Sequence, residues 1–490
     1  MDIWGAVMGQ IARRIAHGKS VCLTDRTFLE REIAAWKGGP VRGMQIQGFR
    51  YCDGDHDILR CKRTVIGEDG DLREVENLPN NRIVDNQYGK LVAQKTNYLL
   101  GQPLVVECEN GQYAALLKKV FDKRFMSTLK NAGKAALCGG IAWLYPYYNS
   151  EGEFCFRLFP AYEILPFWRD SEHTELDCAV RLYEVQGYDG FTPVTVEKAE
   201  VYAADGVHCF LYEGGRLLPD PDAAGDGGCA YVTSGDTALN WQRVPLVAVK
   251  YNETETPLLK RVKTLQDGLN TMLSDFENRM QEDPRNTVLV VKNYDGTNLG
   301  EFRANLAQYG AVKVCTADGI EGDVTALEIN VSSENYKAIL DLYKKAIIEN
   351  GMGFDAKDDR LSGNPNQMNI QSMYSDIDLD ANDMETELQA AFDNLLWFVN
   401  AHLANTGQGD FAGDDVTITF NRDMLMNETE AIANCAASAG LLSEETIVAQ
   451  HPWVDDPQAE LARLKRQREE EQQREYDPFT AAEGTDNEKQ

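Results

Sequence analysis

The chain has 490 residues, 78 acidic and 48 basic, so its formal net charge is −30 at pH 7. A strongly acidic surface repels phosphate, which argues against a conventional DNA-binding protein with a basic patch and against an anionic membrane as partner. The length predicts two or more domains, and a hydrophobic content of 43% is typical of globular proteins. No apolar run approaches the roughly 18 residues that a membrane span requires.

The cysteine pattern indicates reduced thiols. The eleven cysteines are scattered and form no CxxC pair, which is usual for proteins of a reducing compartment. Cys52, His56 and Cys61 lie close in sequence, but a zinc site needs a fourth ligand, and none is present nearby. We therefore expect no metal and no cofactor.

The first hundred residues are expected to contain three helices. Two short ones occupy residues 1–37, the second with an apolar face and a Gly-Gly-Pro stop. Residues 41–78 are polar and are expected to be irregular, with weak strand signals. The third helix is capped by Asn80 or Asn81 and ends at Gly101.

The chain then changes from helix to strand. Residues 104–107 are expected to form a short strand, and residues 112–137 a helix broken near 123–126. Strands rich in aromatic and β-branched residues follow, at 141–148, 154–159, 179–185, 194–202 and 208–212. Residues 1–250 therefore indicate one α+β domain.

Two strongly periodic helices mark the centre of the chain. Residues 257–283 form the first and residues 333–350 the second. Between them a small mixed unit is expected, with strands at 287–292 and 311–315 and a helix near 299–308. This order predicts a small head on a two-helix stalk.

A charged loop with glycines and a proline, residues 351–366, separates the second stalk helix from a long helix at 367–405. Such a loop between rigid helices indicates a segment that contacts another molecule. The long helix has no Lys or Arg between Ser375 and Asp393, only acids. Like charges along a helix are mildly destabilising, which hints at a role for their sign.

The last part is expected to be helical. A strand at 416–420 precedes a helix that begins with a capping box at Asn427, and Ser443 caps the next helix. A charged helix at 459–476 follows, and the last twelve residues, from Phe479, are expected to be disordered.

Signatures of catalysis are weak. The sequence has no GxSxG or HExxH motif, and its six histidines pair with no nucleophile in a known pattern. Asp205, His208 and Cys209 are better explained as neighbours at a strand end than as a catalytic cysteine site. Carboxylates at every second residue of a helix do not face one metal ion. We expect no enzymatic activity.

Four segments in order along the chain carry a resemblance to a known family. They are NRIVDNQYGKLVAQKTNYLLGQPLVVE at 81–107, and the segments 244–280, 362–396 and 427–461. From about Asn80 to Pro457 the chain resembles the portal proteins, or head–tail connectors, of tailed bacteriophages, of the type found in long-tailed phages of Gram-positive hosts. Segment 186–240 does not align with the wing of that family.

The resemblance implies an α+β portal-like architecture with named parts. These are a wing at 1–250, stem helices at 257–283 and 334–350, a clip at 284–333, a tunnel loop at 351–366, a long wing helix and strand at 367–426, a helical crown at 427–478 and a disordered tail at 479–490.

The resemblance also implies a function and its partners. The chain would form a homo-oligomeric ring, usually of about twelve copies, at one capsid vertex of the virion, after a stage in the host cytoplasm. Double-stranded DNA would be packaged and ejected through its channel without sequence specificity. The large terminase subunit, the major capsid and scaffold proteins, and head-completion or tail adaptor proteins would bind it.

Candidate site residues follow from these parts. An acidic channel wall avoids the counterion release that would hold DNA tightly, and the loop cations would make transient phosphate contacts. The DNA-channel loop candidates are Lys357, Arg360, Asn364 and Asn366; the channel acids are Asp376, Asp380, Asp383 and Glu387; and the clip partner contacts are Lys292, Arg303 and Lys313.

Two other functions remain open from the sequence. The first is a capsid adaptor or scaffold without a channel, which a ring with a central hole would exclude. The second is a Mg²⁺-dependent nuclease or hydrolase that uses the carboxylate-rich segment, which a lack of metal-dependent DNA cleavage would argue against.

Overall fold

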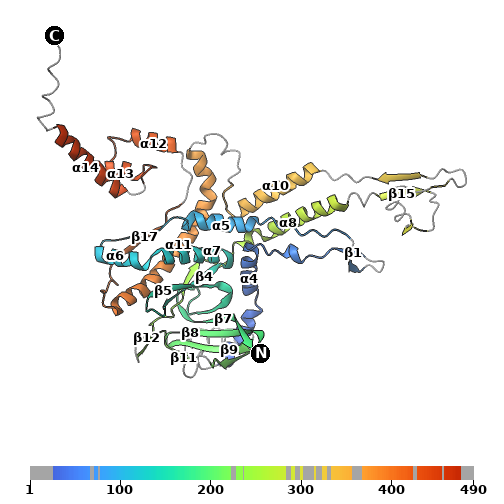
Figure 1. The fold of residues 1–490 in the computed structure, drawn as a ribbon, viewed down its shortest axis with the longest axis horizontal. Helices are drawn as coiled ribbons and strands as arrows, with labels where there is room; N and C mark the ends of the chain where they lie inside the picture. The colour runs from blue at the N-terminus through green and yellow to red at the C-terminus, as the bar shows by residue number, and fades with distance from the viewer. Residues whose placement is uncertain are drawn as a thin grey trace, which may run out of the picture. The chain divides into compact units, whose positions relative to one another are not determined.

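The chain forms two compact units, one of Met1–Gly353 with Asp380–Arg422 and one of Phe354–Leu379 with Asp423–Gln490. The computed structural model describes residues 26–66, 71–75, 78–221, 228–234, 237–282, 288–292, 298, 300–301, 314–315, 323–327, 333–355, 367–422, 428–454 and 457–475. Helices and sheets are mixed along the chain (Figure 1), which confirms the α+β class.

The first described helix, α3 (Arg26–Lys37), is the one expected before the Gly-Gly-Pro stop. The next helix, α4 (Pro40–Cys52), is a correction, because this polar stretch was expected to be irregular. Pro40 stands at the start of α4, where its missing N–H costs nothing. The helix buries Gln45, Gly48 and Tyr51, so its inner face is too polar and too small to show as an apolar stripe.

A single helical turn and a small hairpin follow α4. The turn is η1 (Asp57–Arg60), and the hairpin pairs β1 (Thr64–Ile66) with β2 (Leu72–Glu74). Helix α5 spans Gln87–Leu100 and is capped by the Asn86 side chain. The expected start at Asn80 or Asn81 is therefore wrong by about two turns.

A three-stranded sheet forms the first core. Its order is β14 (Val247–Lys250), β4 (Ile141–Tyr148) and β5 (Phe154–Pro160), all antiparallel. Helix α7 (Lys123–Gly139) packs on this sheet. Helix α6 (Gly111–Val120) comes before it in the chain, and Phe121 and Asp122 separate the two helices.

A larger antiparallel sheet carries the second core. Its strands follow the order β10 (Arg216–Pro219), β9 (Gly206–Glu213), β8 (Thr192–Ala203), β7 (Leu176–Asp189) and β6 (Ile164–Trp168), and β11 (Gly228–Cys229) pairs with β9. Leu29 and Ile33 of α3 pack into the core of this sheet. The large sheet contains the strands between residues 186 and 219, which belong to the segment that was not expected to align with the family wing.

Two long helices run side by side in the first unit, α8 (Leu259–Glu282) and α10 (Ser333–Asn350) (Figure 1). Strand β15 (Val288–Lys292) pairs with β16 (Asp323–Leu327). The second strand expected in this part of the chain, at 311–315, lies mostly outside the described residues.

The remaining strands of the first unit are short. Strand β3 (Val105–Cys108) pairs with β17 (Val416–Thr419), and β12 (Val232–Ser234) with β13 (Thr237–Leu239). None of the described helices has the length and apolar character of a membrane span.

Helix α11 (Gln367–Asn405) contributes to both units. Its turns up to Leu379 belong to the second unit, and those from Asp380 onward to the first. The second unit also contains α12 (Glu428–Ala437), α13 (Glu444–Ala449) and α14 (Pro457–Glu475). Ser443 caps α13 as expected, accepting the Thr446 N–H.

Candidate functional site: the polar junction of α4, η1, α5 and α8

A row of polar side chains on α8 holds the extended segment that leads into α5. The four side chains are spaced four residues apart, so they lie on one face of the helix. Each accepts a backbone N–H of the lead-in segment or of the first turn of α5, at 2.7–3.0 Å: Asn278 from Asn81, Ser274 from Ile83, Asn270 from Asp85 and Gln266 from Tyr88.

This row explains why α5 starts at Gln87. The N–H groups of residues 81, 83 and 85 point to one side of an extended chain and are satisfied by α8. The two free N–H groups of the first helical turn are met by Gln266, at Tyr88, and by the Asn86 cap, at Gly89. The α8 side chains thus hold residues 81–85 in an extended conformation, and α5 begins only after them.

His56 connects this row to α4. Its ring is fully buried and stacks on Tyr51 with ring centroids 4.3 Å apart. Asn270 donates its side-chain N–H to His56 Nδ1 at 2.8 Å, so Nε2 carries the proton and donates to the Tyr51 carbonyl at 3.0 Å. Burial lowers the pKa of His56, and the imidazole is neutral in the folded protein.

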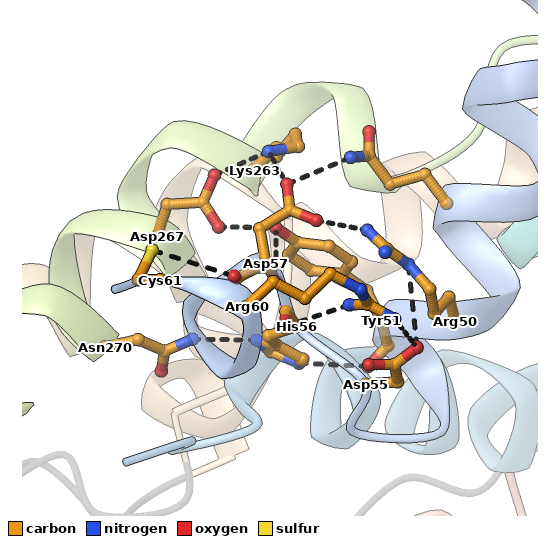
Figure 2. Close-up of polar contacts among 11 residues, drawn as sticks. Arg50, Tyr51, Asp55, His56, Asp57, Arg60, Cys61, Lys263, Asp267 and Asn270 are labelled. Carbon is orange, nitrogen blue, oxygen red and sulfur yellow. Dashed lines mark hydrogen bonds and ion pairs between the residues drawn. The ribbon is translucent and has the colours of Figure 1, made fainter. Parts of the chain in front are cut away.

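Asp57 is the charged centre of the junction (Figure 2). Its carboxylate accepts from Lys263 at 2.9 Å and from Gln47 at 3.2 Å, and it forms an ion pair with Arg50. Burial alone would raise the pKa of Asp57, but Lys263, and after it Tyr51 and Arg50, lower it below its usual value.

Tyr51 and Asp267 complete the cluster. The Tyr51 hydroxyl donates to Asp267 at 2.6 Å, and Lys263 bridges the two aspartates, reaching Asp267 at 2.6 Å. Burial and the bond to Asp267 raise the pKa of Tyr51 well above its usual value. The junction therefore ties α8 to α4 and η1 through paired charges and uncharged hydrogen bonds.

The geometry of this junction suits mechanical linkage rather than catalysis or metal binding. Both ring nitrogens of His56 are engaged, and Cys61 Sγ donates to the Asp57 carbonyl at 3.7 Å. Within the described ranges, no group of three or more His, Cys, Asp or Glu side chains is placed to hold a metal ion. Elsewhere, burial and Glu200 raise the pKa of Cys209 to about 11, so at neutral pH it is a thiol rather than a nucleophilic thiolate.

The channel loop and clip candidates fall largely outside the described residues. Lys357, Arg360, Asn364 and Asn366 all lie there, as do Arg303 and Lys313. Lys292 is the last residue of β15 and is in register with Asp323 of β16. These candidates remain predictions.

The four acid candidates on α11 differ in their surroundings. Asp376 and Asp383 are exposed, and Glu387 is half-buried and lines a cleft of about 1050 Å³. Asp380 is only 3% exposed and is paired with Lys95 and Arg261. This corrects the expectation for Asp380, whose charge is compensated inside the protein; the other three remain predictions.

The polar face of α8 is the feature that sequence analysis missed. Besides its apolar positions, this helix carries Gln266, Asn270, Ser274 and Asn278, which repeat every four residues. A polar stripe at helical spacing within an otherwise amphipathic helix was therefore an available signal for a buried polar interface.

Comparison with known proteins agrees with the resemblance. The sequence profile of a family described as "Phage portal protein, SPP1 Gp6-like" matches residues 46–474. A portal protein of Bacillus phage SPP1 is 29% identical over 92% of this chain and 88% of its own length. A portal protein of Clostridium phage phiCD119 is 27% identical over 84% of this chain and 89% of its own.

A solved structure, "Neck of native GTA particle computed with C12 symmetry", aligns over 74% of this chain and 87% of that chain, at 13% identity and a TM-score of 0.37. That likeness is too low to carry an argument. The profile match spans most of the chain, and the two relatives match over most of their own length. The chain therefore belongs to the SPP1 Gp6-like family of phage portal proteins.

Proposed function

We propose that this protein forms the portal ring at one capsid vertex of a tailed phage, and that double-stranded DNA is packaged and ejected through its central channel. The ring would contain about twelve copies, as the resemblance to portal proteins implies, with one heterologous contact repeated around it. The observation that carries this proposal is the family match over residues 46–474.

The paired helices α8 and α10 support ring formation physically. Ile339 and Leu342, three residues apart on α10, are exposed apolar side chains, as is Met280 near the end of α8. Ile339 and Leu342 share one face of α10, and exposed apolar side chains that lie together mark contact surfaces. In the proposed ring, neighbouring copies cover these positions.

The charge of the chain supports passage of DNA rather than retention of DNA. Each cation that neutralises a phosphate releases counterions and strengthens binding, so a basic wall would hold DNA. With a net charge of −30, the chain offers the opposite environment. Asp376, Asp383 and Glu387 are the proposed acids of the channel wall, and Lys357 with Arg360 the proposed transient phosphate contacts.

The proposed parts keep the boundaries of the sequence analysis. The wing comprises residues 1–250 and 367–426, the stem 257–283 and 334–350, the clip 284–333 and the crown 427–478. The clip would bind the large terminase subunit during packaging and head-completion or tail adaptor proteins afterwards. The protein would join capsid and scaffold proteins in the host cytoplasm and remain in the virion.

The geometry favours this structural role over the nuclease alternative. A Mg²⁺ site on α11 would use carboxylates that share one face, and Asp380 is central among them. Both Asp380 oxygens are already bound by protein donors, namely Lys95, Arg261 and Tyr251. We therefore propose a portal without catalytic activity of its own.

An in vitro packaging assay tests the proposal. Empty capsids carrying this portal should protect DNA from nuclease when terminase and ATP are added, and the Lys357→Ala/Arg360→Ala variant should package less DNA. The Lys118→Ala/Lys119→Ala variant, which removes two cations in the last turn of α6, should package normally. If the Lys357→Ala/Arg360→Ala variant packages as much DNA as the wild type, these residues are not phosphate contacts. DNA protection that does not depend on the portal would exclude the proposed function.

A further inference from the structure

The side chain of Lys95 bonds to both ends of one long excursion of the chain. The first unit ends at Gly353 and resumes at Asp380, and the 26 residues between, Phe354–Leu379, belong to the second unit. Lys95 Nζ donates to the Met352 carbonyl at 2.8 Å and to Asp380 Oδ2 at 2.6 Å. One ammonium group therefore holds the residues next to both crossing points.

The site around this ammonium is built and buried. Lys95 is 4% exposed and Asp380 3%. The Tyr251 hydroxyl lies 2.8 Å from both Asp380 oxygens, and Arg261 donates to Oδ1 at 2.6 Å. Burial, reinforced by the Asp380 charge, raises the pKa of Tyr251, so its hydroxyl keeps the proton that it donates.

The end of α10 is shaped to meet Lys95. Met352 has a φ of 51°, a left-handed conformation that is unfavourable for a side chain of this kind, and it lies between Gly351 and Gly353. A Cβ atom at Gly351 would lie 2.6 Å from Leu91 Cδ1, and one at Gly353 would also collide with Leu91. Leu91 stands one turn before Lys95 on α5, so the same helix face fixes the end of α10 by shape and by charge.

The Lys95–Asp380 ion pair positions the two ends of the excursion more than it stabilises the fold. A buried ion pair can usually be replaced by apolar residues with little loss of stability, because desolvation offsets the attraction. An apolar side chain at position 95 cannot donate a hydrogen bond to the Met352 carbonyl, however well it packs. What Lys95 supplies uniquely is a donor that reaches both ends of the excursion at once.

We propose that Lys95 and Asp380 are positioning residues that fix the root of the Phe354–Leu379 excursion, so that its helical turns are presented to DNA in one place during packaging. This inference rests on the proposed portal function. It assigns Lys95 and Asp380 to the working part of the protein, although neither would contact DNA.

Three variants separate position from stability. Lys95→Met removes the donor, whereas Lys95→Met/Asp380→Asn also neutralises the Asp380 carboxylate, which would otherwise keep Arg261 as its cationic partner. Lys90→Met, at an exposed position of α5, is the matched control. Hydrogen exchange of the intact protein reports the amides of residues 351–353 and 367–379, and thermal unfolding reports stability.

We expect the exchange of these amides to rise about tenfold in Lys95→Met and to remain raised in the double variant, even though its melting temperature returns towards that of the wild type. Exchange in α7 and in the Lys90→Met control should not change. If the double variant restores both exchange and stability, or if Lys95→Met leaves exchange unaltered, the positioning role is overturned.

Packaging by the same variants tests whether the Lys95–Asp380 pair matters for function. If wild-type protein packages DNA, the double variant should assemble as wild type does and package about tenfold less, a ratio that corresponds to the loss of one good interaction. Normal packaging by a double variant with raised exchange would overturn the role in DNA presentation. Failure of the wild type itself would count against the proposed function, and the exchange measurement would still decide whether Lys95 fixes the root.

Discussion

Asn270 and His56 fix each other at the junction: the Asn270 amide donates to His56 Nδ1 at 2.8 Å, while its oxygen accepts the Asp85 N–H at 3.0 Å. Because Asn270 is fully buried, water cannot replace these bonds. One amide thus connects α8 with the turn after α4 and with the segment that leads into α5.

Replacement of Asn270 by Ala should destabilise the protein more than the removal of so few side-chain atoms implies. The change leaves His56 Nδ1 and the Asp85 N–H without their partners in a buried site, and each such group costs about 1–3 kcal/mol. We expect a loss of about 2–4 kcal/mol in the free energy of unfolding, measured by denaturant titration. Thr271→Ala, at an exposed neighbouring position on α8, should change it little. Equal stability of the two variants would contradict the proposed role of the polar row.

The buried neutral state of His56 predicts a loss of stability in acid. The pKa is lowered by folding, so below the unfolded value of about 6.5 the unfolded chain binds a proton that the folded chain does not. Stability from this group is therefore complete above that pH and falls as the pH decreases towards the folded pKa, by at most about 1.4 kcal/mol per pH unit.

The comparison with His56→Gln isolates this effect. Between about pH 7.5 and 5.5, a range that spans the unfolded His pKa of about 6.5, the wild type should lose more free energy of unfolding than the variant. His402, whose pKa burial also lowers, is present in both proteins, so its contribution cancels. Parallel pH profiles would show that His56 does not titrate differently on folding.

Helix α4 offers a matched pair of glycine substitutions. A Cβ at Gly48 would collide with the carbonyl oxygen of Cys138 on α7, whereas a Cβ at Gly43 meets nothing within 4 Å. Gly48→Ala should therefore destabilise the protein by about 3 kcal/mol or more through overpacking. Gly43→Ala should stabilise it by about 0.5–1 kcal/mol through helix propensity. Thermal unfolding of both variants tests the close approach of α4 to α7.

The channel acids predict a loss of packaging that has a different physical cause from the loss expected for the loop cations. Asp383→Asn/Glu387→Gln should slow DNA movement, because neutral walls repel phosphate less. Glu107→Gln/Glu109→Gln, which removes two exposed acids in and after β3, is the control for net charge. The packaging rate at low salt is the measurement. Equal slowing by both pairs would assign the effect to net charge rather than to α11.

The sequence predicted the elements whose periodicity is strong. The long helices α10 and α11 begin and end at the expected residues, and strand β4 occupies the expected range. In each of these, local pattern and tertiary burial agree, so a pattern of apolar residues is enough to locate them.

The errors arise where tertiary hydrogen bonds decide local structure. The start of α5 is set by acceptors on α8 that lie about 180 residues away in the chain, and helix α4 is buried through a glycine and polar residues. Asp380 looked like its acidic neighbours in sequence, and only the fold brings Lys95 and Arg261 to it. The sequence shows the polar repeat of α8, but it does not show which distant segment those side chains bind.

The oligomeric state of the purified protein tests the central proposal most directly. Cryo-electron microscopy with native mass spectrometry should show a closed ring of about twelve copies with an axial hole, at high protein concentration and, if necessary, with scaffold protein. A ring whose central hole is lined by α11 acids would support the account. A protein that stays monomeric or dimeric under all these conditions, or a closed assembly without an axial hole, would contradict it.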